Sequence, residues 1–301
     1  MTIVFGTVAK NIEGSIFQLI QFLNELVKVL PDAQFFMYEN NSTDGTRNYF
    51  PMLQSLIPNI HIESDTFTHE ELLQKCVARS CENNPCRMEL ISHARNKLLT
   101  MIRSNGYGCD GDLVVMFDCD MVSIPTEPLL ERLRAFPDEV DVLFANGLSR
   151  NGQTYYDMYA LRYGNNPFGP ELLANTFWDS MPQICIKQSI PVISAFGGLA
   201  IYRGKCLDNS RYSAIPTRAL DTIYKQLIKQ TGFTPSKETH KNGAAMGIYL
   251  FGQGPEDIFY LNNSGYNFPV VCEHSTFHAD MMTRGYGRFR IDPDLKYYSN
   301  H

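Results

Sequence analysis

Several features that assign a chain to a specialised class of protein are missing from this sequence. No segment reaches the roughly 18 uninterrupted apolar residues of a membrane-spanning helix. No run of Lys or Arg stands out and the formal net charge is −6, so nucleic acid is not expected as a main partner. The first residues enter an apolar strand pattern without a signal-peptide pattern. We expect a soluble, cytoplasmic protein, or a Golgi-lumen protein if an amino-terminal anchor was removed.

The eight cysteines show none of the C-x2-C pairs that are typical of a structural zinc site. Cys76, Cys81 and Cys86 are separated by four residues each. Eight cysteines in 301 residues do not indicate a disulfide scaffold. We expect free buried thiols, with a pairing among these three cysteines as the alternative.

Strand and helix patterns alternate through the first half of the chain. Apolar runs predict strands over residues 3–8, 34–38, 60–63, 113–117 and 141–145. Apolar residues at helical spacing predict helices over residues 16–30, 70–78, 88–102 and 125–133. This alternation is typical of an α/β fold with a Rossmann-like, mostly parallel central sheet flanked by helices.

The second half, residues 147–301, is richer in aromatic residues, glycines and short irregular segments. It contains a predicted loop over 231–245, a predicted strand over 270–278 that ends in an acid and two histidines, and a closing strand near 289–291. No linker rich in Pro, Gly or Ser separates the halves, and no internal repeat is present. We therefore expect both halves to share one sheet.

The most informative stretch is the apolar run Leu113–Phe117 followed by Asp118-Cys119-Asp120. Five consecutive apolar residues predict a strand that is buried on both faces, and ligands of open α/β sheets bind at the carboxyl ends of such strands. Two carboxylates separated by one residue suit Mg²⁺ or Mn²⁺ bridging a diphosphate. The same letters fit a HAD-like phosphatase loop with Asp118 as the nucleophile. A solvated strand end is the alternative without a function.

Together, several segments resemble a glycosyltransferase of the GT-A fold, most closely the CAP59 family of capsule-associated α-1,3-mannosyltransferases with its microbial and viral relatives. The matching segments follow the family order over about residues 3–298: Tyr38–Thr46, Ala94–Asn96, Asp118–Asp120, Tyr156–Arg162, Ser194–Gly198 and Cys272–His274. The resemblance implies a single GT-A domain over residues 1–301. Residues 1–146 are then the nucleotide-sugar-binding half, and residues 147–301 are the acceptor-binding and closing half.

The resemblance implies a metal-dependent hexosyltransferase, with a mannosyltransferase-like enzyme as the more specific option. Such an enzyme moves a sugar from a UDP- or GDP-sugar to a hydroxyl of a glycan or glycoconjugate, with retention of configuration. Its cofactor is Mn²⁺ or Mg²⁺, held by Asp118 and Asp120. A non-catalytic glycan-binding protein on the same fold is a further alternative.

The predicted site residues fall into four groups. The donor is expected to contact Thr7, Lys10, Asn11, Glu39, Asn40, Asp44, Arg95, Asp118, Gly197 and Gly198. A carboxylate beside the acceptor hydroxyl is needed as base or as stabiliser of the transition state, and Glu273 is the first choice, with Asp257 second. Tyr156, Asp157, Arg162 and Trp178 are expected to line an acceptor groove. His274 or His278 is expected as a third metal ligand, because imidazole suits Mn²⁺.

Overall fold

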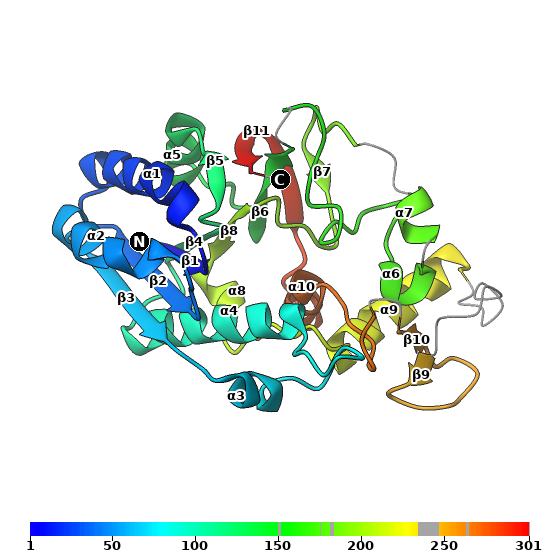
Figure 1. Cartoon of the computed structure of the whole chain (residues 1–301). Helices are drawn as coiled ribbons and strands as arrows, with labels where there is room; N and C mark the ends of the chain where they lie inside the picture. The colour runs from blue at the N-terminus through cyan, green and yellow to red at the C-terminus, as the bar shows by residue number, and fades with distance from the viewer. Residues whose placement is uncertain (150–151, 175, 181–183, 234–246, 263–264, 301) are drawn as a thin grey trace.

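Within the described residues, a sheet of nine strands runs through the centre of the protein in the order β3-β2-β1-β4-β8-β6-β11-β5, with β7 paired to β11 (Figure 1). The computed structural model describes residues 1–301 except 150–151, 175, 181–183, 234–246, 263–264 and 301. The strands of this sheet are β1 (Ile3–Ala9), β2 (Gln34–Asn40), β3 (Ile60–Asp65), β4 (Leu113–Phe117), β5 (Met121–Ser123), β6 (Val142–Leu148), β7 (Ile190–Pro191), β8 (Leu199–Arg203) and β11 (Phe289–Ser299). Strands from both halves of the chain therefore share one sheet, as predicted.

The directions of the strands create a switch point at the centre of the sheet. β3, β2, β1 and β4 are parallel neighbours, and β8 is antiparallel to both β4 and β6. β11 is parallel to β6, so six of the nine strands run the same way within the described chain. The chain leaves β1 towards β2 and β3 on one side and later returns to β4 on the other. In open α/β sheets, ligands bind at the carboxyl ends of strands at such a point.

Helices cover both faces of the sheet (Figure 1). They are α1 (Ile16–Val29), α2 (Phe50–Leu56), α3 (His69–Gln74), α4 (Arg87–Ser104), α5 (Thr126–Arg134), α6 (Pro170–Leu173), α7 (Thr176–Ser180), α8 (Gly204–Leu207), α9 (Arg218–Thr231) and α10 (Glu273–Thr283), with 3-10 turns η1 (Glu13–Ser15) and η2 (Gly45–Tyr49). A small two-stranded sheet pairs β9 (Gly247–Tyr249) with β10 (Phe259–Leu261). Among the helices described, none is both long and apolar enough to cross a membrane.

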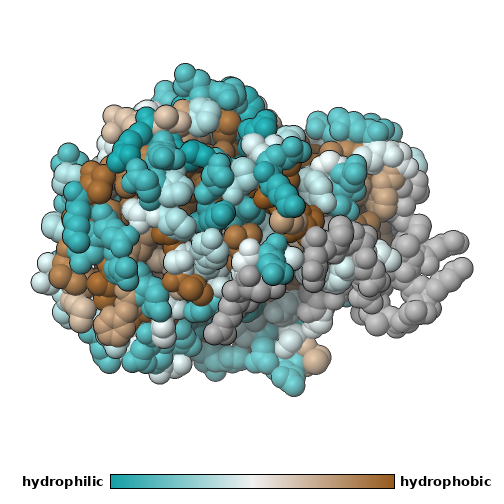
Figure 2. All heavy atoms as spheres, turned by 90° about the horizontal axis from the view of Figure 1, so that it is seen from above, coloured by the Kyte–Doolittle hydropathy of each residue, from teal (hydrophilic) through white to brown (hydrophobic). Residues whose placement is uncertain are grey.

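Alternating residues of the buried strands form two separate cores. Phe5 and Val115 pack with the apolar stripes of α1 and α5, whereas Val4 and Val114 pack with those of α4 and α10. Successive side chains of a strand point to opposite faces, so β1 and β4 must be apolar throughout. On the outer face seen in Figure 2, hydrophilic and hydrophobic residues are interspersed.

Most regular elements of the first half agree with the predictions, but one strand predicted in the second half and the length of one helix in the first half are wrong. Residues 270–278 do not form a strand: Glu273 begins α10, and Phe277 and Met281 follow at helical spacing and pack into the core. The helix predicted over 70–78 ends at Gln74, because Ala78 instead pairs with Cys86 through its backbone. Most of the predicted loop at 231–245 lies outside the described residues. All eight cysteines are free thiols, as predicted, although Cys81, Cys109 and Cys185 are exposed.

Candidate functional site

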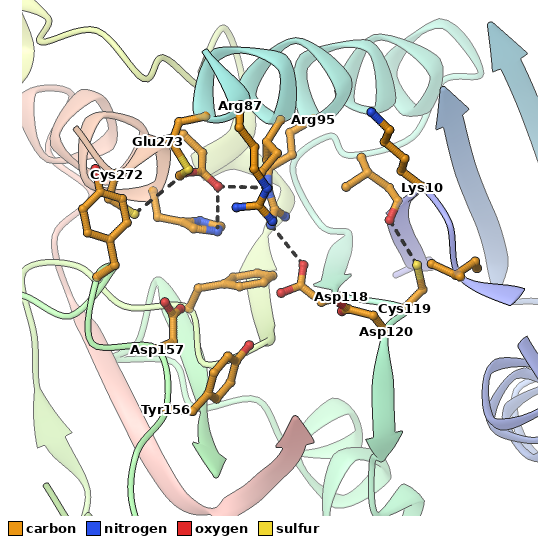
Figure 3. A pocket seen from close by; sticks show the side chains of 17 residues that line it. Lys10, Arg87, Arg95, Asp118, Cys119, Asp120, Tyr156, Asp157, Cys272 and Glu273 are labelled. Atoms are coloured by element: carbon orange, nitrogen blue, oxygen red, sulfur yellow. Dashed lines mark hydrogen bonds and ion pairs between the residues drawn. The ribbon is translucent and has the colours of Figure 1, made fainter. Parts of the chain in front are cut away.

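A cavity of about 310 Å³ lies at the carboxyl ends of β1 and β4, at the switch point of the sheet (Figure 3). Asp118 and Asp120 follow β4 directly and Lys10 follows β1. The remaining charged lining residues, from α4, α10 and the segment after β6, are Arg87, Arg95, Asp157 and Glu273. The predicted position of the Asp118-x-Asp120 pair at a strand end facing a cavity is therefore confirmed.

Asp118 is held in place through its backbone and its side chain. Its N–H donates to the Gly198 carbonyl at 2.8 Å, and the Tyr297 hydroxyl donates to its carbonyl at 3.2 Å. Arg95 Nη2 donates to Asp118 Oδ1 at 3.0 Å. Burial raises the pKa of Asp118 to about 6 even though Arg95 lowers it, and the neighbouring Asp120 adds to the rise. The site therefore concentrates negative charge that Arg95 compensates only in part.

Arg95 joins Asp118 to Glu273 across the cavity (Figure 3). Its guanidinium is buried over the Phe196 ring at 4.8 Å, and its Nε lies 3.4 Å from Glu273 Oε1. Burial would lower the pKa of Arg95, but the two carboxylates outweigh it and raise the pKa. Burial raises the pKa of Glu273, and Arg95 opposes that rise. Glu273 thus reaches the cavity from the first turn of α10, where its charge also complements the helix dipole.

Tyr156 and Asp157 form the wall opposite Arg87 and Arg95 (Figure 3). The Gly197 N–H donates to Asp157 Oδ2 at 3.1 Å, and burial raises the pKa of this carboxyl to about 6. Tyr156 stacks against Tyr297 of β11 with ring centroids 5.9 Å apart. These two predicted acceptor residues therefore meet the predicted metal-binding pair at one cavity.

A second cavity of about 450 Å³ continues the first along the ends of β1 and β2. Lys10 and Arg87 line both cavities, so the two volumes form one trough. Asn11 and Asn40, both predicted donor contacts, line the second cavity. The trough thus has basic side chains where its two parts join and amide side chains in its second part.

Glu39 and Asp44 do not face the trough, which corrects their predicted contact with the donor. Glu39 is fully buried, and its Oε2 accepts from Arg47 Nε at 2.6 Å. Asp44 accepts from the N–H groups of Thr46 and Glu13, each at 3.0 Å. Asp44 thereby ties the loop after β2 to the loop after β1, whereas Glu39 ties β2 to Arg47 and to Ser64 of β3. Both carboxylates stabilise segments next to the trough, and neither lines it.

His278 is not placed to bind a metal ion. It is fully buried, with Nδ1 2.9 Å from Ser194 Oγ and Nε2 3.2 Å from Tyr202 Oη, and burial lowers its pKa to about 3. His274 does line the cavity, stacked on Phe196 with centroids 4.1 Å apart. Burial lowers its pKa as well, so its ring is neutral. Helix α10 turns His278 into the core, which the predicted strand could not show.

Asp257 and Arg162 also lie outside the lining of the cavity. Asp257 pairs with Lys225 of α9 at 2.6 Å and accepts from the Gly254 N–H, so the structure does not bring it to the cavity where its predicted catalytic role would be needed. Arg162 is buried beside Glu171, 3.7 Å away, and donates to the Tyr159 carbonyl. Arg162 therefore supports the wall from inside the core and does not contact a ligand in the cavity.

Thr7, Gly197 and Gly198 have structural positions. Thr7 is buried within β1. Gly197 and Gly198 have φ values of +63° and +80°, and a Cβ at Gly198 would lie 2.3 Å from the Tyr297 ring. Glycine is needed there for the turn into β8. The predicted contact of these residues with the donor is not supported by the lining of either cavity.

Arg87 is the main lining residue that the sequence reading missed. Arg87, Ile91 and Arg95 all line the first cavity, and their spacing of four places them on one face of α4. Once Arg95 was a candidate, this spacing was sufficient to identify Arg87. Tyr159 and Phe196 also line the cavity, but only as apolar residues in irregular segments.

The carboxylates at the cavity fit a hard divalent cation that is shared with a bound anion. The described residues contain no group of three His, Cys, Asp or Glu that could hold a metal ion. Mg²⁺ is commonly held by one or two carboxylates together with substrate phosphates, and Mn²⁺ accepts the same oxygen ligands. Oδ1 of Asp118 accepts a hydrogen bond from Arg95, and burial and the nearby Asp120 raise the pKa of Asp118. A cation here would offset that concentration of negative charge.

The sequence matches no protein-family model and no curated protein. The solved structures that are similar in fold include the following three. Residues 1–349 of S. aureus TarS are 14% identical, over 99% of this chain and 60% of that chain, with a TM-score of 0.46. Mycobacterium tuberculosis glucosyl-3-phosphoglycerate synthase with Mn²⁺, UDP and phosphoglyceric acid is 15% identical, over 89% of each chain, with a TM-score of 0.40.

The third structure is the mannosyltransferase PcManGT from Pyrobaculum calidifontis with GDP-Man and Mn²⁺. It is 12% identical, over 99% of this chain and 56% of that chain, with a TM-score of 0.42. This chain thus spans less than two thirds of the TarS and PcManGT chains, and the likeness is too low to assign a function.

Proposed function

We propose that this protein is a metal-dependent glycosyltransferase of the GT-A type, which transfers a sugar from a UDP- or GDP-sugar to a hydroxyl of a glycan or glycoconjugate. One observation carries the proposal: Asp118 and Asp120 share a cavity with Lys10, Arg87 and Arg95 at the switch point of a doubly wound sheet. A diphosphate is bound by a cation, which carboxylates hold, together with positively charged side chains that contact the phosphates.

The trough accommodates the donor in two parts. Lys10 and Arg87 lie where the two cavities join, so they contact the diphosphate. The nucleoside occupies the second cavity, whose amide side chains Asn11 and Asn40 supply hydrogen bonds. The transferred sugar then points into the first cavity, towards Glu273 and the opposite wall.

Asp118 and Asp120 would hold Mn²⁺ or Mg²⁺, which when bound would supply charge neutralisation for the departing diphosphate. Arg95 fixes the orientation of Asp118 through Oδ1, and it opposes the rise in the pKa of Glu273 that burial causes. Arg95 and Glu273 are themselves almost inaccessible to solvent in this part of the cavity. Electrostatic stabilisation is strongest where donors and charges are held before the reaction begins.

Glu273 is the proposed catalytic carboxylate, either as base or as stabiliser of an oxocarbenium-like transition state. Asp157 and Tyr156 hold the acceptor hydroxyl on the opposite wall. The family resemblance implies retention of configuration at the anomeric carbon. The anomeric proton signals of the product, recorded before mutarotation, test this point.

Nucleotide binding tests the proposal most directly. Thermal-shift measurements with UDP, GDP and CMP, with and without Mn²⁺, should show stabilisation that requires both the nucleotide and the metal. NDP release from the matching nucleotide-sugar should then be metal-dependent, and Asp120→Ala should abolish both signals. Asp110→Ala, an exposed acid before β4, is the matched control that retains them.

Two other results would overturn the proposal in favour of the alternatives. Trapping of a phosphoaspartate mimic at Asp118 with beryllium fluoride would favour a HAD-like phosphatase. Glycan binding that survives a chelator and Asp118→Asn, without NDP release, would favour a non-catalytic glycan-binding protein.

A further inference from the structure

Trp178, the only tryptophan in the chain, exposes a large aromatic ring on the short helix α7. Its side chain is 54% exposed. Single exposed apolar residues are common on protein surfaces, and Phe17 on α1 is 63% exposed. Trp178 differs from Phe17 because of the ring on which it stacks.

That ring belongs to Tyr159, a lining residue of the first cavity. The centroids of Tyr159 and Trp178 lie 6.4 Å apart and the planes are inclined by 17°. Parallel rings in contact stand about 3.5–4 Å apart, so a separation of 6.4 Å means that the rings are displaced sideways. Each ring therefore covers only part of the face of the other. The two rings, here called the aromatic ledge, extend an aromatic surface from the cavity wall to the exterior.

The aromatic ledge is supported from inside the core. Phe177 is fully buried and meets Trp178 edge to face, with centroids 4.7 Å apart. The Arg162 guanidinium lies 5.3 Å from the Phe177 ring, and its Nη1 donates to the Tyr159 carbonyl at 2.9 Å. Arg162 thus contacts Phe177, on which Trp178 packs, and the backbone of Tyr159. A ledge that is fixed in advance loses little conformational freedom when a ligand binds.

We propose that the aromatic ledge is an acceptor subsite outside the reaction centre, and that the acceptor is an oligosaccharide. The inference rests on the proposed function, which assigns the wall of Tyr156 and Asp157 to the acceptor. The sugar that receives the new bond lies at that wall, and the adjoining sugar stacks on Trp178. Pyranose rings present C–H faces that pack on aromatic rings while their hydroxyls stay in water, and tryptophan offers the largest such face.

Tryptophan fluorescence tests the subsite directly, because a chain with one tryptophan reports only on Trp178. The probes are manno-, gluco- and chito-oligosaccharides, each from the monosaccharide to the tetrasaccharide. In at least one series, the disaccharide and longer members should change the emission with saturation, and the monosaccharide should not. Emission that responds to no series, or equally to a monosaccharide, overturns the inference.

Substitution of Trp178 gives a second measurement. The affinity gained between the monosaccharide and the trisaccharide of the responding series, measured by calorimetry, should fall about tenfold in Trp178→Ala. Trp178→Phe should keep part of the gain because it retains a ring. Phe17→Ala, an exposed aromatic on the other half of the chain, should keep all of it. An unchanged gain in Trp178→Ala overturns the subsite.

These measurements also separate the two proposals. If the wild-type protein shows no metal-dependent nucleotide binding, the proposed function is contradicted. The fluorescence titration needs neither nucleotide nor metal, so its result is independent. A protein that binds nucleotide as proposed but shows no length-dependent emission change keeps the proposed function and loses the subsite.

Discussion

Replacement of Arg95 by methionine tests whether this residue holds the candidate site together. The guanidinium is 6% exposed, and it lies 3.0 Å from Asp118 and 3.4 Å from Glu273. With an effective dielectric constant of about 20, Coulomb's law gives roughly 5 kcal/mol for each pair before desolvation. Breaking a buried pair costs about 3–5 kcal/mol, because the remaining charge stays buried. We expect Arg95→Met to lower the free energy of unfolding by about 3–5 kcal/mol.

Urea unfolding followed by circular dichroism measures the change in the free energy of unfolding. A double-mutant cycle with Glu273→Gln assigns part of this change to the pair of Arg95 and Glu273. The double variant should be more stable than the sum of the single effects predicts, by about 1–3 kcal/mol. Lys97→Met is the matched control on the same helix, because its ion pair with Glu63 is exposed at 2.9 Å. An exposed pair of this kind contributes at most about 1 kcal/mol.

Two outcomes would refute the reasoning. If Arg95→Met were no less stable than Lys97→Met, the guanidinium would not compensate buried charge. If the effects of Arg95→Met and Glu273→Gln simply added, the two groups would not interact across the cavity. Either result would remove the Asp118–Arg95–Glu273 connection from the proposed site.

Three further predictions concern the surroundings of the site. Gly198→Ala should lower the free energy of unfolding by about 1–3 kcal/mol because φ is +80°. Gly14→Ala should change it little because an added Cβ there would meet no atom within 4 Å, and thermal unfolding compares the two variants. Arg87→Ala should weaken binding of the matching nucleotide about tenfold in calorimetry. The free energy of unfolding should not change, because Arg87 is exposed. Unchanged affinity would exclude the contact of Arg87 with a phosphate. Burial would raise the pKa of Asp141, but hydrogen bonds from Arg288 keep this pKa below its ordinary value. The pair therefore stabilises the fold above about pH 4, and this contribution is lost as the pH falls through the lowered pKa. Urea titrations of Arg288→Met and the wild type should therefore converge at low pH, and a constant difference would contradict the assignment.

The strands and helices of the first half were predictable because their patterns are local. Leu113–Phe117 is apolar at every position, and this alone places Asp118 and Asp120 at the end of a buried strand. The assignment of residues 270–278 failed for the same reason. A short apolar run before an acid does not distinguish a strand end from the start of a helix whose inward face is mixed.

The direction of individual side chains was less predictable. Glu39 lies near the end of β2, just before a polar loop, but its carboxylate accepts hydrogen bonds from Arg47 and Ser64 in other segments. His278 has the chemistry of a metal ligand, but α10 turns it towards Ser194 and Tyr202. Partners that lie far away in sequence decided both cases.

The sequence by itself determined that the fold is α/β and that two acids end a buried strand, because apolar periodicity and turn chemistry act over a few residues. Only the tertiary structure decided which groups face those acids. Sheet order and helix packing bring Arg87, Arg95, Asp157 and Glu273 to the ends of β1 and β4, and they carry Asp257 and His278 elsewhere. These distances depend on the burial of whole faces of helices and strands, which is a property of the assembled core and not of any one segment.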